Sequence, residues 1–192
     1  MSGTGLPPSF WEDRFKAQTT PWERGGINPA FLAWRAAAAL APCRLLVPGA
    51  GRSPEPAALL ADGFDVVALD LAATAVAFQQ DALSTDRAVM ADVTVWRPDR
   101  VFDAVYDQTC LCALPPALWP AYEASLRAWL RPGGALFILF MQTGREGGPP
   151  FDCPLPAMRT LFCAWDWPDA LEAPVPHWNA NVEQPVVLRH RP

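Results

Sequence analysis

The sequence predicts an α/β fold with a doubly wound, mostly parallel sheet of seven strands. Short apolar runs alternate with segments of helical character, and this alternation is typical of parallel strands joined by right-handed crossovers. The run Leu45–Pro48 ends in a tight glycine turn, and the run Phe64–Leu69 ends at a carboxylate, Asp70. The second run is nearly all apolar, as expected for a strand that is covered on both faces.

Local signals place the helices. Asn28 and Pro29 form an N-cap and first-turn pair, so a helix is expected over Pro29–Leu40. Proline also suits the first turn of the next helix, Pro54–Asp62, which Gly63 ends. The other expected helices are Ala72–Ala82, Pro116–Leu130, whose apolar residues recur at helical spacing, and Pro156–Cys163.

The strands are bounded by glycine and proline. The turn Arg131–Gly134 precedes an unbroken apolar run, and a proline- and glycine-rich loop, Gln142–Pro156, follows that run. In chain order the expected strands are Leu45–Pro48, Phe64–Leu69, Ala88–Ala91, Phe102–Tyr106, Ala135–Met141, Cys163–Trp167 and Val182–Arg189.

Length and composition narrow the class of protein. With 192 residues, 51% of them hydrophobic, one domain is expected, with an N-terminal part at 1–42 and a core at 43–192. A formal charge of −5 without a basic cluster argues against a nucleic-acid partner. No signal sequence or bilayer-length apolar run is visible, so a cytoplasmic protein without a membrane partner is expected. Five cysteines without a CxxC pair, and two histidines, predict no metal site.

The glycine turn is the first candidate binding site. Gly49 and Gly51 let the backbone approach a ligand closely, and Asp70 follows Gly51 by 19 positions, a spacing typical of nucleoside sites in which the acid binds ribose hydroxyls. Pro54 stands where a dinucleotide loop needs a small residue, and it removes an N–H that a pyrophosphate would use. This favours a nucleoside without phosphate. A plain turn between a strand and a helix explains the same glycines.

More specific motifs lie in order along the chain. They are Phe10-Trp11-Glu12-Asp13-Arg14-Phe15 with Thr20-Pro21-Trp22-Glu23, Val47-Pro48-Gly49-Ala50-Gly51, Phe102-Asp103-Ala104-Val105-Tyr106-Asp107 with Cys112-Ala113-Leu114-Pro115, and Gly147-Gly148-Pro149-Pro150-Phe151. On these motifs, from about Phe10 to Leu188, the chain resembles the thiopurine methyltransferase-like group of class I S-adenosylmethionine-dependent methyltransferases. That group has a Rossmann-like fold and includes thiol, thiocyanate and halide methyltransferases.

The resemblance implies S-adenosylmethionine as the cofactor and an N-terminal lid from which Trp11, Phe15 and Trp22 line its site. A sulfonium cation is attracted to aromatic faces by roughly 0.5–2 kcal/mol per contact. The alternative is that these three aromatics only pack the N-terminal segment onto the core.

The resemblance also assigns the parts of the cofactor to residues. It implies that Gly49, with Gly51 in the same loop, contacts the methionine part, that Asp70 binds the ribose, and that Asp92 and Val93 flank the adenine. A turn acid that caps the following segment is the alternative for Asp92.

The end of the fourth strand is the candidate acceptor site. Tyr106, Asp107 and Gln108 are expected to position the acceptor, and Gln108 also to contact the cofactor. Family members often have arginine or tyrosine at this last position, so the glutamine leaves the acceptor's identity open. The loop Gln142–Phe151 is expected to cover the acceptor, with a rigid surface connection as the alternative.

The predicted activity is methyl transfer to a small-molecule nucleophile, such as a thiol or sulfide, thiocyanate, a halide or a thiopurine-like compound. Two alternatives are a non-catalytic S-adenosylmethionine-binding protein and a nucleotide-dependent oxidoreductase; Pro54 and the lack of a Tyr-x-x-x-Lys pair weigh against the second. Cys110 and Cys112 have no histidine nearby in sequence to activate them, so they are not expected to act as nucleophiles. A monomer or a small homo-oligomer is expected.

Overall fold

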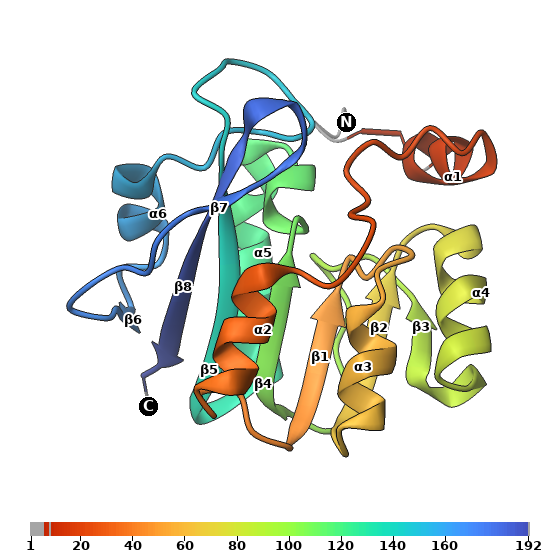
Figure 1. Ribbon diagram of the computed structural model, residues 1–192, viewed down its shortest axis with the longest axis horizontal. Coiled ribbons are helices and arrows are strands. Elements are labelled where there is room, and N and C mark those ends of the chain that lie inside the picture. The colour runs from red at the N-terminus through yellow and green to blue at the C-terminus, as the bar shows by residue number, and fades with distance from the viewer. Residues whose placement is uncertain (1–5, 8, 192) are drawn as a thin grey trace.

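The computed structural model describes residues 6–7 and 9–191, and among these residues it contains one eight-stranded sheet with helices on both faces (Figure 1). The strands are β1 (Arg44–Pro48), β2 (Asp65–Asp70), β3 (Ala88–Met90), β4 (Phe102–Gln108), β5 (Leu130–Gln142), β6 (Trp165–Asp166), β7 (Val175–Pro176) and β8 (Val182–His190). The helices are α1 (Ser9–Lys16), α2 (Pro29–Ala36), α3 (Glu55–Ala61), α4 (Ala73–Ala82), α5 (Trp119–Trp129) and α6 (Leu155–Leu161). No helix in the described part of the chain has the length and apolarity needed to cross a membrane.

The strand order is β3-β2-β1-β4-β5-β8-β6, and β7 pairs with β8. The first five strands of this order are parallel, whereas β8 is antiparallel to its neighbours. The doubly wound, mostly parallel sheet predicted from the sequence is confirmed. Seven strands form the continuous order, as predicted, and the two-residue β7 is an addition that the sequence did not indicate.

Helices cover both faces of the sheet. On one face α5 and α6 pack over the strands, and Trp129 of α5 belongs to the same buried cluster as Val105 of β4. On the other face α2 and α3 pack, and the ring of Trp34 meets that of Phe137 of β5 edge-on at a centroid distance of 5.2 Å. The parallel strands are therefore buried on both sides, which explains their continuous apolar sequences.

Strand β8 inserts between β5 and β6. It pairs with β5 from Ala135, opposite Arg189, to Gln142, opposite Val182. This long antiparallel pairing brings the first residues of β8 to the edge of the sheet at which the parallel strands end (Figure 1).

The largest differences between the predicted and observed boundaries occur at three places. Helix α2 ends at Ala36, four residues early, because Ala38 has a φ of +53° and leaves the helical region. The predicted turn at Arg131–Gly134 lies inside β5, where Gly133 has a φ of +75° and the pairing with β4 shifts register. The strand expected over Cys163–Trp167 is reduced to the two residues of β6.

Candidate functional site

A cavity of about 810 Å³ opens at the edge where β1, β2 and β4 end. Its size lies within the range of small-molecule sites. The wall combines the glycine loop after β1, the ends of β2 and β4, the N-terminal segment and the loop after β5. In an open α/β sheet ligands bind at this edge, outside the carboxyl ends of the strands.

The glycine loop presents backbone to the cavity. Gly49 and Gly51 line it with φ values of +58° and +52°, a region that residues with side chains rarely adopt. A Cβ added to Gly49 would lie 3.0 Å from the Cβ and Sγ atoms of Cys110, so a side chain there would displace the loop after β4.

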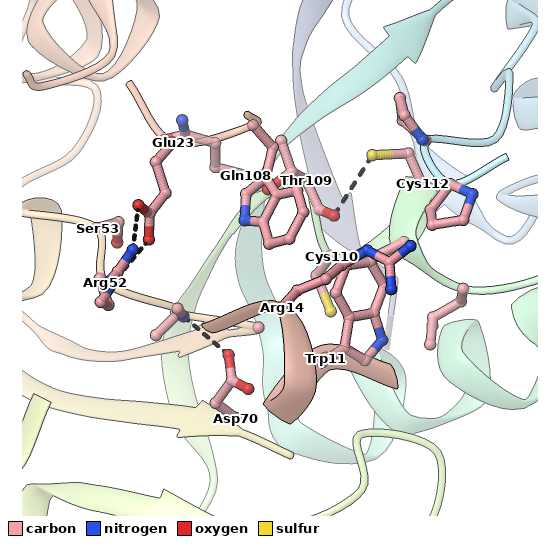
Figure 2. Close-up of a pocket in the computed structure, with 18 of the residues that line it drawn as sticks. Trp11, Arg14, Glu23, Arg52, Ser53, Asp70, Gln108, Thr109, Cys110 and Cys112 are labelled. Carbon is pink, nitrogen blue, oxygen red and sulfur yellow. Dashed lines mark hydrogen bonds and ion pairs between the residues drawn. The ribbon is translucent and has the colours of Figure 1, made fainter. Parts of the chain in front are cut away.

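Asp70 joins this loop to the end of β2. Its Oδ2 accepts a hydrogen bond from the Gly51 amide at 2.8 Å (Figure 2). Its Oδ1 accepts one from the Ala72 amide at 2.9 Å. Burial raises the pKa of this carboxyl, although the two amides act in the opposite direction. Each carboxylate oxygen keeps a lone pair for another donor, such as a ligand hydroxyl.

The N-terminal lid, defined here as residues 9–24, closes the cavity with aromatic rings. Trp11, Phe15 and Trp22 all line the cavity. Trp22 contacts Trp11 and Phe15 edge-on, at centroid distances of 5.4 and 5.9 Å. The three aromatic rings therefore pack on one another and also line the cavity. Packing of the N-terminal segment and lining of the cavity do not exclude one another.

Two carboxylates anchor the lid to the core. Glu12 accepts hydrogen bonds from the amide and the hydroxyl of Thr74 in the first turn of α4, at 2.9 and 2.8 Å. Glu23 pairs with the Arg52 guanidinium through two contacts of 2.7 Å, beside the glycine loop (Figure 2).

Asp92 and Val93 also line the cavity, after β3. The Oδ1 atom of Asp92 accepts hydrogen bonds from the amide and the hydroxyl of Thr94, at 2.8 and 2.7 Å. The carboxylate therefore caps its own turn, as the alternative interpretation expected, and it also borders the cavity.

At the end of β4 the structure separates the three predicted acceptor residues. Tyr106 and Gln108 line the cavity, and the Tyr106 hydroxyl donates to Oε1 of Gln108 at 2.7 Å. Asp107 is fully buried and does not contribute to the wall. The expectation that Asp107 positions the acceptor does not fit this location.

Asp107 instead stabilises the loop after β4 by hydrogen bonds made inside the core. Its Oδ2 accepts from the Tyr122 hydroxyl at 2.9 Å, and its Oδ1 accepts from the Cys110 amide at 2.9 Å. Burial raises the pKa of Asp107 to about 6. Burial also raises the pKa of the Cys110 and Cys112 thiols well above their ordinary value, which keeps both protonated and poorly nucleophilic.

The loop after β5 contributes Pro149 and Pro150 to the cavity wall. It is attached at both sides, because the Phe151 amide donates to the carbonyl of Cys112 at 2.7 Å and Arg145 donates to the Asn181 side chain at 2.8 Å. The loop thus borders the cavity, in the place where a cover was expected.

Another part of the wall consists of polar residues that the motifs did not indicate. Arg24, Glu55 and His177 line the cavity, and Asn28 and Glu183 lie buried behind them; these five residues are called the Arg24 cluster below. Arg24 and Glu183, which form an ion pair of 2.8 Å, are 159 positions apart. No local pattern relates residues at such a separation.

Comparisons with known proteins agree with the geometry. The family described as Thiopurine S-methyltransferase (TPMT) matches residues 6–172. Thiocyanate methyltransferase 1 of Arabidopsis thaliana is 32% identical over 148 residues, which cover 73% of this chain and 65% of the plant protein. Thiopurine S-methyltransferase of Pseudomonas putida (strain GB-1) is 30% identical over 189 residues, covering 87% of each chain.

Solved structures share the fold. The 1,6-didemethyltoxoflavin-N1-methyltransferase of Burkholderia thailandensis, solved with its substrate and S-adenosylhomocysteine, superposes with a TM-score of 0.76 at 22% identity, covering 96% of this chain and 87% of the other. A methyltransferase of Anabaena variabilis ATCC 29413 superposes with a TM-score of 0.74 at 14% identity, covering 96% and 95%. The fold is that of S-adenosylmethionine-dependent methyltransferases, and the chain belongs to the thiopurine S-methyltransferase family.

Proposed function

We propose that this chain is an S-adenosylmethionine-dependent methyltransferase that acts on a small-molecule nucleophile. The observation that carries the proposal is the enclosure of one cavity by three aromatic lid residues, the glycine loop and Asp70. When bound, S-adenosylmethionine supplies an electrophilic methyl group on a sulfonium sulfur.

The residues of the wall fit this cofactor. Asp70 offers carboxylate oxygens to a vicinal diol, and Asp92 and Val93 border the same space. Aromatic rings of the lid suit the sulfonium cation. Gly49, with a φ of +58° and no Cβ to collide with Cys110, lets the loop after β1 line this space with backbone.

The chain's contribution to the reaction is orientation and exclusion of water. Alignment of a nucleophile with the methyl group is worth up to about 7–11 kcal/mol in well-oriented systems. Tyr106 fixes the Gln108 side chain beside the acceptor, while the lid and the loop after β5 cover the cavity. A thiolate or sulfide needs no strong general base. The groups around the site fit this, because the Cys110 thiol stays protonated and the carboxyl of Asp107 is buried away from the cavity.

The acceptor belongs to the class of thiols and sulfides, thiocyanate, halides and thiopurine-like compounds. Support comes from relatives named thiocyanate methyltransferase, probable thiol methyltransferase and thiopurine S-methyltransferase. We extend the proposal to one domain of residues 1–192, since the lid and the core build the same cavity, and to the cytoplasm, where free thiols such as these five cysteines persist.

Isothermal titration with S-adenosylmethionine and S-adenosylhomocysteine tests the cofactor. We expect binding of both, and no binding at hundred-micromolar concentrations would overturn the proposal. Headspace gas chromatography after incubation with sulfide, methanethiol, thiocyanate or iodide tests the acceptor. Binding of the cofactor without a methylated product from these acceptors or from a thiopurine would indicate a binding protein without catalysis.

A further inference from the structure

Arg24 is one of three arginines that line the cavity, together with Arg14 and Arg52. At the end of β4, Gln108 is neutral, and its Oε1 is occupied by the Tyr106 hydroxyl. Arg24 lines the same cavity from the segment between α1 and α2. A guanidinium is therefore present in the cavity, although it comes from the lid and not from β4.

Among the residues that the structure describes, Nη2 is the only guanidinium nitrogen of Arg24 with a hydrogen-bond partner. Nη2 donates to the carbonyl of Pro176 and to Oε2 of Glu183, and it lies 3.3 Å from Nδ1 of His177. Within the described residues Nε is buried without a hydrogen-bond partner. The ion pair with Glu183 thus fixes the guanidinium by one nitrogen and leaves the others for a ligand.

Beside it, Glu55 has an unused carboxylate oxygen. Glu55 is 1% exposed and lines the cavity, and its Oε1 accepts from the Asn28 amide at 2.8 Å. Its Oε2 is buried and has no hydrogen-bond partner in the part of the chain that the structure describes. The side chain of Asn28 donates to Glu183, so the two carboxylates are attached to the same residue.

The charges of the Arg24 cluster do not balance. Arg24 supplies one positive charge, whereas Glu55 and Glu183 supply two carboxylates. His177 does not contribute a second cation at neutral pH, because burial and the Arg24 charge lower its pKa to about 4. Burial raises the pKa of Glu55, as expected for a carboxylate without its own cation. A ligand ammonium would give Glu55 the cationic partner that it lacks.

We propose that Arg24 and Glu55 bind the α-amino-acid group of a ligand, with Arg24 taking the carboxylate and Glu55 taking the ammonium. Charge-assisted hydrogen bonds of this kind are stronger than hydrogen bonds between neutral groups. The inference rests on the proposed function, in which two ligands carry such a group: the methionyl end of the cofactor, and an amino-acid thiol used as acceptor.

The test compares ligands with and without that group. S-Adenosylhomocysteine and 5′-methylthioadenosine share the nucleoside and the thioether, but only the first has the amino-acid end. Isothermal titration of Glu55→Gln, which keeps the acceptor for the Asn28 amide, and of Arg24→Lys, which keeps a cation for Glu183, should show a roughly 10- to 100-fold loss for S-adenosylhomocysteine. The affinity for 5′-methylthioadenosine should stay within about twofold.

Arg35→Gln is the matched control, because Arg35 forms a 2.7 Å ion pair with Asp62 away from the cavity. It should change neither affinity. If both cluster variants bind S-adenosylhomocysteine normally but raise KM for L-cysteine and not for ethanethiol, the amino-acid group recognised is that of the acceptor.

Two results would overturn the inference. One is unchanged binding together with unchanged KM for both thiols, and another is an equal loss for both nucleosides, which would indicate general damage to the site. If the wild-type protein binds neither nucleoside, the proposed function fails first. Thermal unfolding of each variant shows whether it is folded.

Discussion

Two parts of the cavity wall are built in different ways. The nucleoside part consists of the glycine loop, Asp70 and Asp92, which follow consecutive strands and use backbone amides. The Arg24 cluster consists of side chains from segments up to 159 positions apart, held by buried charges. The first part is a product of local sequence and the second of tertiary packing. We therefore expect substitutions in the cluster to affect folding, and substitutions in the nucleoside part to affect mainly binding.

The largest effect should follow loss of the buried acid. Glu183→Ala leaves Arg24 without its ion-pair partner and Asn28 without its acceptor, and breaking a buried pair in this way costs about 3–5 kcal/mol. Urea unfolding measures the loss. Asp62→Ala, which breaks the more exposed pair with Arg35, should cost less than about 1 kcal/mol. Equal costs for the two variants would contradict the importance assigned to the buried ion pair of the Arg24 cluster.

The next effect is a pair of opposite pH dependences. Asp107 has a folded-state pKa of about 6, above its ordinary value, so the folded state binds the proton more tightly and stability falls as pH rises from about 4 to 6. His177 has a folded-state pKa of about 4, below its ordinary value, so stability rises over nearly the same range. The two contributions oppose one another in the wild type.

Single variants should separate these contributions. Asp107→Asn removes a contribution of at most about 3 kcal/mol that falls with pH, so between about pH 4 and 6 its unfolding free energy should fall less, or rise more, than that of the wild type. His177→Gln should change the slope in the opposite direction relative to the wild type. Urea titrations at several pH values measure both. Parallel pH profiles for the two variants would contradict the assignment of these groups.

A smaller effect is expected at the nucleoside part. Asp70→Ala should weaken S-adenosylhomocysteine and 5′-methylthioadenosine alike, by roughly 1–3 kcal/mol, because the lost carboxylate faces the shared nucleoside. Isothermal titration of both ligands measures this, with Asp65→Ala as control, since Asp65 begins the same strand and pairs with Arg44 and Arg87. A loss confined to S-adenosylhomocysteine would place Asp70 at the amino-acid end instead.

The smallest change in stability should come from the lid. Arg52→Gln breaks a partly exposed pair with Glu23, so the free energy of unfolding should change by less than about 1 kcal/mol. Because the pair joins the lid to the glycine loop, the dissociation rate of S-adenosylhomocysteine should nevertheless increase. Stopped-flow tryptophan fluorescence measures that rate, and Arg127→Gln, on α5, is the control. Equal rates in both variants would show that the pair does not restrain the lid.

Much of the fold was predictable because its signals are local. Strand ends, glycine turns and the cap at Asn28 depend on neighbouring residues, and the structure confirms the side-chain cap of α2. The extent of α2 was wrong, since a run of alanines favours helix but Ala38 adopts a left-handed conformation. The eight-residue helix α1 was not predicted.

In the site, too, the residues marked by local signals were predictable and the others were not. Residues at the ends of parallel strands line the cavity because those ends meet at one edge. The interpretation of Asp107 neglected strand alternation: Tyr106 and Gln108 point to one face, so Asp107 points to the other, toward Tyr122. Arg24 and Glu55 had no motif to indicate them, since their environment depends on Glu183 from β8.

The insertion of β8 also sets an order of assembly. Ribosomal synthesis delivers the glycine loop and Asp70 early, whereas Glu183 emerges near the end of these 192 residues. Contacts of such high sequence separation form slowly, because a long loop must close before they can be made. Arg24 is among the first residues made, but its ion-pair partner, Glu183, lies in β8. The charge of Arg24 is therefore neutralised only after β8 has been made. The part of the cavity wall around Arg24 is thus completed only when β8 has paired with β5.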